Sequence, residues 1–158
     1  MPVTARSVLF VAVAAVLALG PSACGKDSKD GGKNAAGKKP TVEVPSGNAP
    51  TTLQKTDLIV GKGAEAVAGK EVTVQYVGVS FATKKQFDAS WDRGQALSFV
   101  VGQGNVIQGW DEGVPGMKVG GRRQLVIPPD LAYGPQGAPP VIGPNETLVF
   151  VVDLLKVG

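Results

Sequence analysis

The chain has 158 residues, of which 43% are hydrophobic and 18% charged, so it can bury the core of one ordinary domain but not of two large ones. It contains no His and one Cys, which excludes His-based triads and proton shuttles, intrachain disulfides and multi-Cys zinc sites. The net charge of +3 arises in residues 1–50, since residues 51–158 carry ten basic and ten acidic side chains. We therefore expect no nucleic-acid partner.

Residues 1–23 have the pattern of a secretory signal peptide. Arg6 is followed by an unbroken apolar run, residues 8–19, and then by small residues. As a helix this run would rise about 18 Å, which is short of the roughly 30 Å hydrocarbon core of a membrane. The alternative is a buried core helix.

Cys24 lies at the end of this leader and is expected to be lipidated. Ser22 and Ala23 before it resemble a bacterial lipobox, although Pro21 stands where an aliphatic residue is usual. A free exported thiol is the alternative. Residues 24–50 would then be the lipidated Cys and a flexible linker rich in Lys, Gly and Pro, which has almost no large apolar side chains. We expect a protein anchored through lipid to the outer face of the bacterial cell membrane.

From residue 51 onward, strand patterns alternate with Gly- and Pro-rich turns. Alternating or β-branched runs predict strands that end near residue 60 and span residues 72–77, 97–101, 122–127 and 148–155. The last run is apolar and nearly continuous, which is typical of a central strand. We therefore predict one α+β domain over residues 51–158, built on an antiparallel sheet.

Residues 106–114 form the only plausible helix of this domain. Ile107, Trp110 and Val114 follow the spacing of one helical face. Two glycines inside the segment lower its intrinsic helix stability, so packing must hold it.

Three short motifs do not fit the functions that they suggest. The segment that begins at Gly102 lacks the third Gly of a dinucleotide-binding loop, and Gly69-Lys70 is followed by Glu71 rather than Ser or Thr. Asp88 and Asp92 have no surroundings that would make one of them the general acid of a glycosidase.

Six segments resemble, in order and spacing, the FKBP-type peptidyl-prolyl cis-trans isomerases: residues 74–78, 87–88, 106–114, 117–122, 127–134 and 147–150. The resemblance covers residues 51–158. It implies an antiparallel sheet of five to six strands wrapped around one short helix.

The resemblance also implies a pocket for the prolyl group. Its catalytic residues would be Tyr76, Phe87, Asp88 and Tyr133, and its substrate-binding residues Phe99, Val106, Ile107, Trp110, Val141, Ile142 and Phe150. Trp110 would form the floor, the N–H of Ile107 and the hydroxyl of Tyr133 would donate to substrate carbonyls, and Arg93 would orient Asp88. The alternatives are that the aromatic residues are plain core and that Asp88 is a solvated turn residue.

Two positions depart from the family pattern. Leu97 stands where the family often has an aromatic residue, and residues 134–144 form a Pro-rich loop with Ala138 where bulkier side chains are common. The resemblance therefore says least about the peptide sequence that the site prefers.

The implied function is an enzyme, a peptidyl-prolyl cis-trans isomerase that accelerates X-Pro rotation in exported proteins. This reaction breaks no bond, so neither a metal nor a cofactor is expected. The expected partners are proline-containing polypeptides and macrolide inhibitors, and the chain is expected to be a monomer. The alternative is a non-catalytic, membrane-tethered module that binds proline segments or acts as a chaperone. A solute-binding or cell-wall structural lipoprotein is a third class, with little support.

Overall fold

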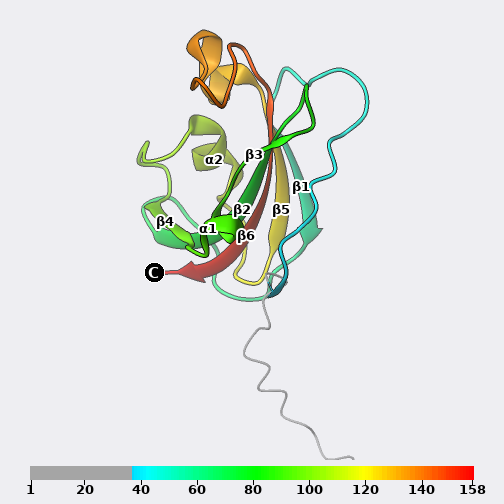
Figure 1. Ribbon diagram of the computed structural model, residues 1–158. Coiled ribbons are helices and arrows are strands. Elements are labelled where there is room, and N and C mark those ends of the chain that lie inside the picture. The colour runs from blue at the N-terminus through cyan, green and yellow to red at the C-terminus, as the bar shows by residue number, and fades with distance from the viewer. Residues whose placement is uncertain (1–36) are drawn as a thin grey trace, which may run out of the picture.

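The computed structural model describes residues 37–158 (Figure 1). The predicted signal peptide, Cys24 and the first part of the predicted linker lie outside the described residues. Within residues 37–158, no helix is long and apolar enough to span a membrane.

The domain is built on one antiparallel sheet of six strands (Figure 1). The path through the sheet is β1-β5-β6-β2-β3, and β4 pairs with β2 on the edge that β3 also uses. The long central pair runs from Val72 opposite Val157 to Ser80 opposite Leu148. The strands are β1 Gln54–Ile59, β2 Glu71–Ser80, β3 Gln86–Ala89, β4 Leu97–Val100, β5 Arg122–Ile127 and β6 Leu148–Val157. The predicted α+β class and antiparallel sheet are confirmed.

The helical part is shorter than predicted and has one more piece. Helix α2, Gln108–Gly113, covers one face of the sheet, and Val106 and Ile107 precede it rather than belonging to it. The prediction that this was the only helix is wrong, because α1 forms a single turn, Ser90–Arg93, between β3 and β4. Four residues are too few to show a helical period in the sequence. Two 3₁₀ turns, Pro129–Leu131 and Gly134–Gln136, lie between β5 and β6.

The two glycines of α2 let the helix lie unusually close to β5. A Cβ on Gly109 would sit 2.4 Å from Cγ2 of Ile127, and one on Gly113 would sit 2.8 Å from Cδ1 of Leu125. Both contacts are shorter than side chains tolerate. Packing against β5 can hold this helix, as expected, because the two glycines lack the side chains that would push α2 off the sheet.

Arg123 ties the end of α2 to the sheet. Its guanidinium donates to the carbonyl oxygens of Gly113 and Pro115 at 2.8 and 3.1 Å, and it forms two hydrogen bonds to the carboxylate of Asp57 on β1 at 2.5 and 3.0 Å. The hydrogen bond from Arg123 lowers the pKa of Asp57. One buried cation thus links β1, β5 and α2.

The sheet is buried on both faces along its centre. The inner face carries the main core under α2, whereas Val77, Val79 and Ala89 form a second cluster on the outer face. Accordingly, β2 is half-buried as predicted only in its first part, and from Val77 onward every residue is buried. Burial on both faces also accounts for the nearly continuous apolar run of β6.

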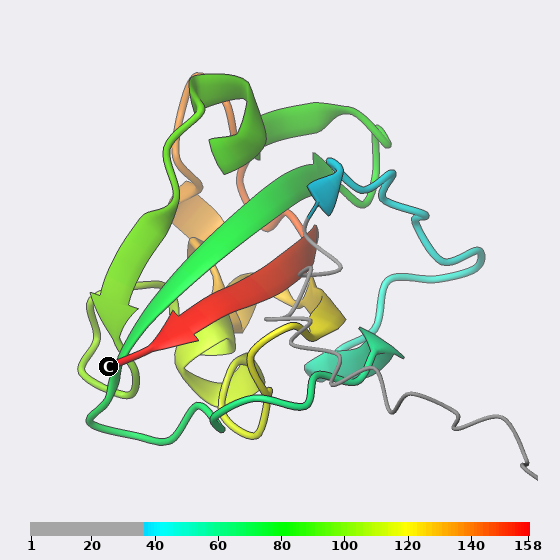
Figure 2. The ribbon, with the colours of Figure 1, turned by 90° about the horizontal axis from the view of Figure 1, so that it is seen from below.

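The outer cluster is covered by residues that precede β1. Val42 and Val44 pack against it together with Trp91, and residues 38–44, which we term the strap, cross the side of the sheet away from α2 (Figure 2). This differs from the expectation of a linker that continues to residue 50: the packed part of the chain begins before residue 51.

Replacing Gly109 by Ala should lower the stability of the domain. The added methyl group collides with Ile127, and overpacking of this kind costs about 1–3 kcal/mol, whereas the same change in an open helix stabilises by about 0.5–1 kcal/mol. Thermal unfolding followed by circular dichroism measures the effect. Gly37→Ala, where nothing lies within 4 Å of the added Cβ, is the control. A Gly109→Ala variant at least as stable as the wild type would contradict the close approach of α2 and β5.

Candidate active site

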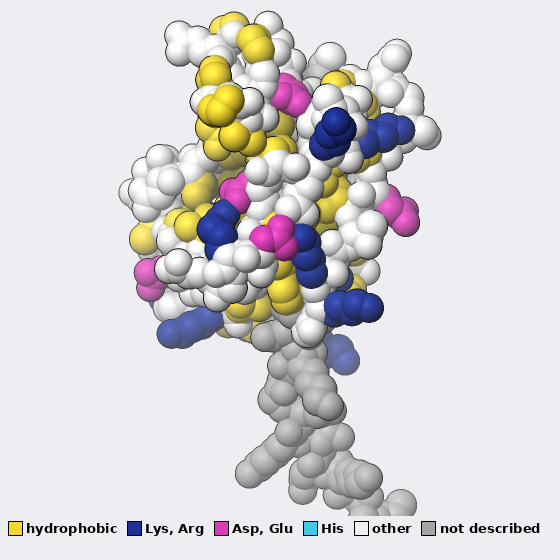
Figure 3. Space-filling model, in the orientation of Figure 1, with side chains coloured by type: hydrophobic (Ala, Val, Ile, Leu, Met, Phe, Trp, Pro, Cys, Tyr) yellow, Lys and Arg dark blue, Asp and Glu magenta, His cyan; other side chains and the backbone are white. Residues whose placement is uncertain are grey.

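A pocket opens between α2, the sheet, the loop that precedes α2 and the segment between β5 and β6. Its volume is about 220 Å³. On the face shown in Figure 3, apolar side chains gather over the segment between β5 and β6, beside this region. The pocket is lined by Tyr76, Phe87, Asp88, Leu97, Asn105, Val106, Ile107, Trp110, Tyr133 and Phe150.

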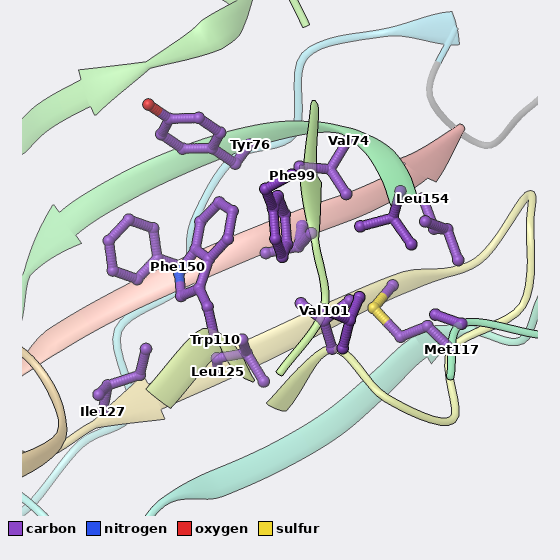
Figure 4. Close-up of a cluster of buried hydrophobic side chains, with 14 of the residues drawn as sticks. Val74, Tyr76, Phe99, Val101, Trp110, Met117, Leu125, Ile127, Phe150 and Leu154 are labelled. Atoms are coloured by element: carbon purple, nitrogen blue, oxygen red, sulfur yellow. The ribbon is translucent and has the colours of Figure 1, made fainter. Parts of the chain in front are cut away.

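The indole of Trp110 lies at the centre of an aromatic cluster (Figure 4), and it lines the pocket together with Tyr76 and Phe150. The rings of Tyr76 and Phe150 meet it edge to face, with centroids 5.1 and 5.3 Å away. Such T-shaped pairs are the favoured geometry for aromatic rings. Only 3% of Trp110 is exposed, yet it lines the pocket, so it is not sealed beneath other side chains.

One wall depends on a glycine in β2. The rings of Phe87 and Phe150 pack at 89° with centroids 5.5 Å apart. A Cβ on Gly78 would lie 2.7 Å from an atom of each ring. The absence of a side chain at this position is what lets the two rings reach the pocket.

A compact polar network stands beside the aromatic cluster. The hydroxyl of Tyr76 donates to Oδ2 of Asp88 at 2.5 Å and accepts a hydrogen bond from Nη2 of Arg93 at 2.8 Å. Arg93 also pairs with Oδ1 of Asp88 and lies over the Tyr76 ring, 5.7 Å from its centroid. The three side chains therefore hold one another, and the geometry agrees with the expectation that Arg93 orients Asp88.

Burial raises the pKa of the Tyr76 phenol, and the hydrogen bond to the Asp88 carboxylate raises it further, while Arg93 acts in the opposite direction. The phenol is therefore a neutral donor throughout the physiological range.

The N-terminal end of α2 forms another wall. Ile107 is the N-cap residue of α2, a position whose N–H has no partner within the helix itself. The loop before it is held by Asp111, whose carboxylate accepts hydrogen bonds from the backbone N–H groups of Gly102 and Gly104 at 2.8 and 2.9 Å. Tyr133, 42% exposed, stands at the rim.

Three predicted substrate-binding residues do not line the pocket. Phe99 is buried in the core and packs against Trp110, with centroids 5.7 Å apart. Ile142 is 6% exposed and belongs to the same core, while Val141 is 56% exposed. Two backbone hydrogen bonds between Ala138 and Ile142 close the loop tightly, and Val141 lies at its exposed turn.

Two lining residues were not among the predicted site residues. For Leu97 the sequence indicates only a departure from the family pattern, and for Asn105 it indicates no role. Asn105 lies in the loop held by Asp111, and no residue pattern in the sequence distinguishes it. Within residues 37–158, no three His, Cys, Asp or Glu side chains gather in a way that could hold a metal ion.

Comparison with known proteins identifies the family to which this arrangement is similar. Residues 62–155 match the family model described as FKBP-type peptidyl-prolyl cis-trans isomerase. A probable FK506-binding protein of Corynebacterium glutamicum is 56% identical over 120 residues, which cover 75% of this chain and 98% of that protein. An FK506-binding protein of Streptomyces anulatus is 54% identical over 121 residues, covering 76% and 98%.

Solved structures agree. The crystal structure of AtFKBP13 superposes with a TM-score of 0.64 at 40% identity, covering 70% of this chain and 96% of that one. The crystal structure of FkpA from Escherichia coli gives a TM-score of 0.62 at 46% identity, covering 68% and 48%. Residues 51–158 make up less than 75% of the chain. The match to the Corynebacterium protein, which covers 75%, therefore extends into the residues before β1.

The phenol of Tyr76 should ionise at a pH above about 10, its usual pKa. Because the chain has only two tyrosines, the titration curve of Tyr76 is the difference between the ultraviolet titrations of the wild type and of Tyr76→Phe. The folded pKa is raised, so the stability that the neutral phenol contributes is complete below about pH 10 and is lost as the pH rises through the folded value. Asp88→Asn should move the midpoint down. A wild-type midpoint at or below about 10 would show that the network is not formed.

Proposed function

The chain belongs to the FKBP-type peptidyl-prolyl cis-trans isomerases, and from that membership we propose that it accelerates X-Pro rotation in exported proteins from the outer face of a bacterial membrane. Its activity is peptidyl-prolyl cis-trans isomerisation. Uncatalysed, this rotation takes tens to hundreds of seconds, so a secreted chain that waits for it stays partly unfolded.

The observation that carries the proposed mechanism is the aromatic pocket floored by Trp110. An X-Pro amide resists rotation because resonance keeps it planar, with a barrier of about 18–20 kcal/mol. The planar amide has more charge separation than the twisted one, since twisting removes the resonance. Transfer from water into an apolar pocket therefore costs the planar ground state more than the twisted transition state, and this difference lowers the barrier.

The polar groups around the pocket have separate roles in this proposal. The N–H of Ile107 and the hydroxyl of Tyr133 donate to the carbonyl groups that flank the proline. The position of Ile107 at the N-cap of α2 and of Tyr133 at the rim supports these roles. Asp88, held by Tyr76 and Arg93, places a fixed charge at the wall without taking up a proton from the substrate.

The size of the pocket supports a small occupant. Its volume of about 220 Å³ is below the roughly 300–1,000 Å³ of pockets that enclose drug-sized ligands. A single prolyl ring with its amide fits this description better than an extended peptide enclosed along its length.

Macrolides of the FK506 type are proposed to bind at the same pocket as the prolyl group, which at about 220 Å³ would enclose only part of such a ligand. The support is the name of the relatives from Corynebacterium glutamicum and Streptomyces anulatus, which match nearly their whole length. Such a ligand would compete with peptide, so its binding does not by itself distinguish an isomerase from a module that only binds proline segments.

A protease-coupled assay with a proline-containing peptide separates these two functions. We expect the wild type to accelerate isomerisation, and Asp88→Val and Tyr133→Phe each to lower kcat/KM several-fold, about 1 kcal/mol or more of lost transition-state stabilisation. Glu43→Gln, an exposed change outside the pocket, is the control. A folded wild type without catalysis that still binds a macrolide would favour the binding module, and unchanged rates in both variants would mean that the site is elsewhere.

Anchoring through Cys24 is tested by labelling cells with a radioactive fatty acid. The full chain should take up the label and Cys24→Ala should not, because the thiol is the proposed acceptor. Pro21→Leu, which restores the usual lipobox residue, should be labelled at least as well as the wild type. Equal labelling of Cys24→Ala would rule out this anchor, as would the absence of label from both the wild type and Pro21→Leu.

A further inference from the structure

The strap, residues 38–44, packs on the domain in an alternating manner. Val42 and Val44 are half-buried against the outer cluster, while Thr41 and Glu43 between and beside them are exposed. This is the two-residue period of an extended segment with one face against a protein surface. The strap is therefore a packed element rather than a chain passing over the surface.

The strap lies behind the polar network of the active site. Its two valines and Trp91 contact Val77, Val79 and Ala89 on the outer face of β2 and β3. In β3, Ala89 faces this cluster, whereas the preceding residue, Asp88, lines the pocket on the opposite face. The residue that pairs with Tyr76 and Arg93 thus sits one position away from the surface that the strap covers.

A second contact joins the strap to α1. Nζ of Lys39 lies 2.6 Å from Oδ1 of Asp92, and the other carboxylate oxygen of Asp92 accepts a hydrogen bond from Nε2 of Gln86 at 2.6 Å. Asp92 therefore connects the strap to the first residue of β3, and it is followed directly by Arg93. Since the ion pair between Lys39 and Asp92 is exposed to solvent, it contributes little binding energy and mainly fixes the orientation of the strap relative to α1.

The strap is also held at its beginning. The carbonyl oxygen of Lys38 accepts a hydrogen bond from Nη2 of Arg122 at 3.0 Å. Arg122 in turn forms two hydrogen bonds with the buried carboxylate of Asp153 on β6, at 2.5 and 3.1 Å. The beginning of the strap is thus tied to the centre of the sheet through Lys38 and to α1 through Lys39.

The part of the site behind which the strap lies is built from two short elements. Strand β3 has four residues and pairs only with β2, and α1 is a single turn of four residues. On the inner side, the hydroxyl of Ser90 fastens α1 to the backbone N–H of Tyr76 at 2.8 Å. On the outer side, Val42 and Val44 of the strap pack against the cluster that contains Ala89, and Lys39 pairs with Asp92 of α1.

We propose that the strap is a positioning element of the active site: by packing Val42 and Val44 against the outer cluster and pairing Lys39 with Asp92 of α1, it sets the placement of Asp88 and Arg93 around Tyr76. The proposal rests on the isomerase function for its effect on rate. The similarity to relatives, which extends into the residues before β1, agrees with a segment that belongs to the catalytic domain. The proposed membrane linker would then end at about residue 37 instead of residue 50.

The test compares two double variants of the full chain. Val42→Ser with Val44→Ser removes the packed face of the strap, and Thr41→Ser with Glu43→Ser changes the exposed face of the same segment. At a temperature where near-ultraviolet circular dichroism shows both to be folded, the packed-face variant should lose roughly three- to tenfold in kcat/KM, mainly in kcat, because small displacements of positioned groups are costly to catalysis. The exposed-face variant should equal the wild type.

A second readout does not depend on catalysis. The ultraviolet titration of Tyr76, obtained by difference from the same variant carrying Tyr76→Phe, should shift to a lower midpoint in the packed-face variant, because Asp88 no longer holds the phenol proton as firmly. The exposed-face variant should show no shift. Val42→Thr with Val44→Thr, which keeps the side-chain shape, replaces the serine variant if the latter does not fold.

The outcomes separate the two proposals. A packed-face variant that melts at a lower temperature but keeps the wild-type kcat/KM and the wild-type Tyr76 midpoint would overturn the positioning role, since the strap would then only cover apolar surface. A wild type that does not isomerise a proline peptide would refute the isomerase function instead, and the Tyr76 midpoint would still decide whether the strap positions the network.

Discussion

The site depends on the close contact between α2 and β5. Trp110 projects from a six-residue helix that has little stability of its own. Gly109 and Gly113 let this helix lie directly on Ile127 and Leu125, and Arg123 holds its end. The indole is thereby placed among the rings of Tyr76 and Phe150. Without that contact the pocket would lose its floor, so residues that never touch a substrate decide whether the site exists.

The chemistry fits a chain that lacks His. Isomerisation forms and breaks no covalent bond, so it needs an apolar place for the prolyl amide and a few well-placed donors rather than an acid, a base or a metal. The ionisable groups beside the pocket are used in another way. Tyr76, Asp88 and Arg93 satisfy one another, so the charges at the wall of an apolar pocket are paired with each other.

The strand pattern predicts the sheet, and the spacing of apolar residues predicts α2. The resemblance to the family implies eight of the residues that line the pocket: Tyr76, Phe87, Asp88, Val106, Ile107, Trp110, Tyr133 and Phe150. The predictions that failed concern how deep a side chain is buried and elements that are only a few residues long. Aromatic character does not tell whether Phe99 faces the pocket or lies behind Trp110, and α1 is too short to show a period. The alternation of Val42 and Val44 with polar residues was a usable signal for the strap, but the Gly, Lys and Pro around it favoured a linker.

In the proposed mechanism, a prolyl ring sits on Trp110 while its amide turns. Nuclear magnetic resonance of the protein mixed with a proline-containing peptide tests it most directly, since one sample reports both the exchange between cis and trans peptide signals and the protein protons near the prolyl ring. We predict accelerated exchange together with nuclear Overhauser contacts between the prolyl ring and the indole of Trp110. Accelerated exchange with prolyl contacts confined to another surface would contradict the account.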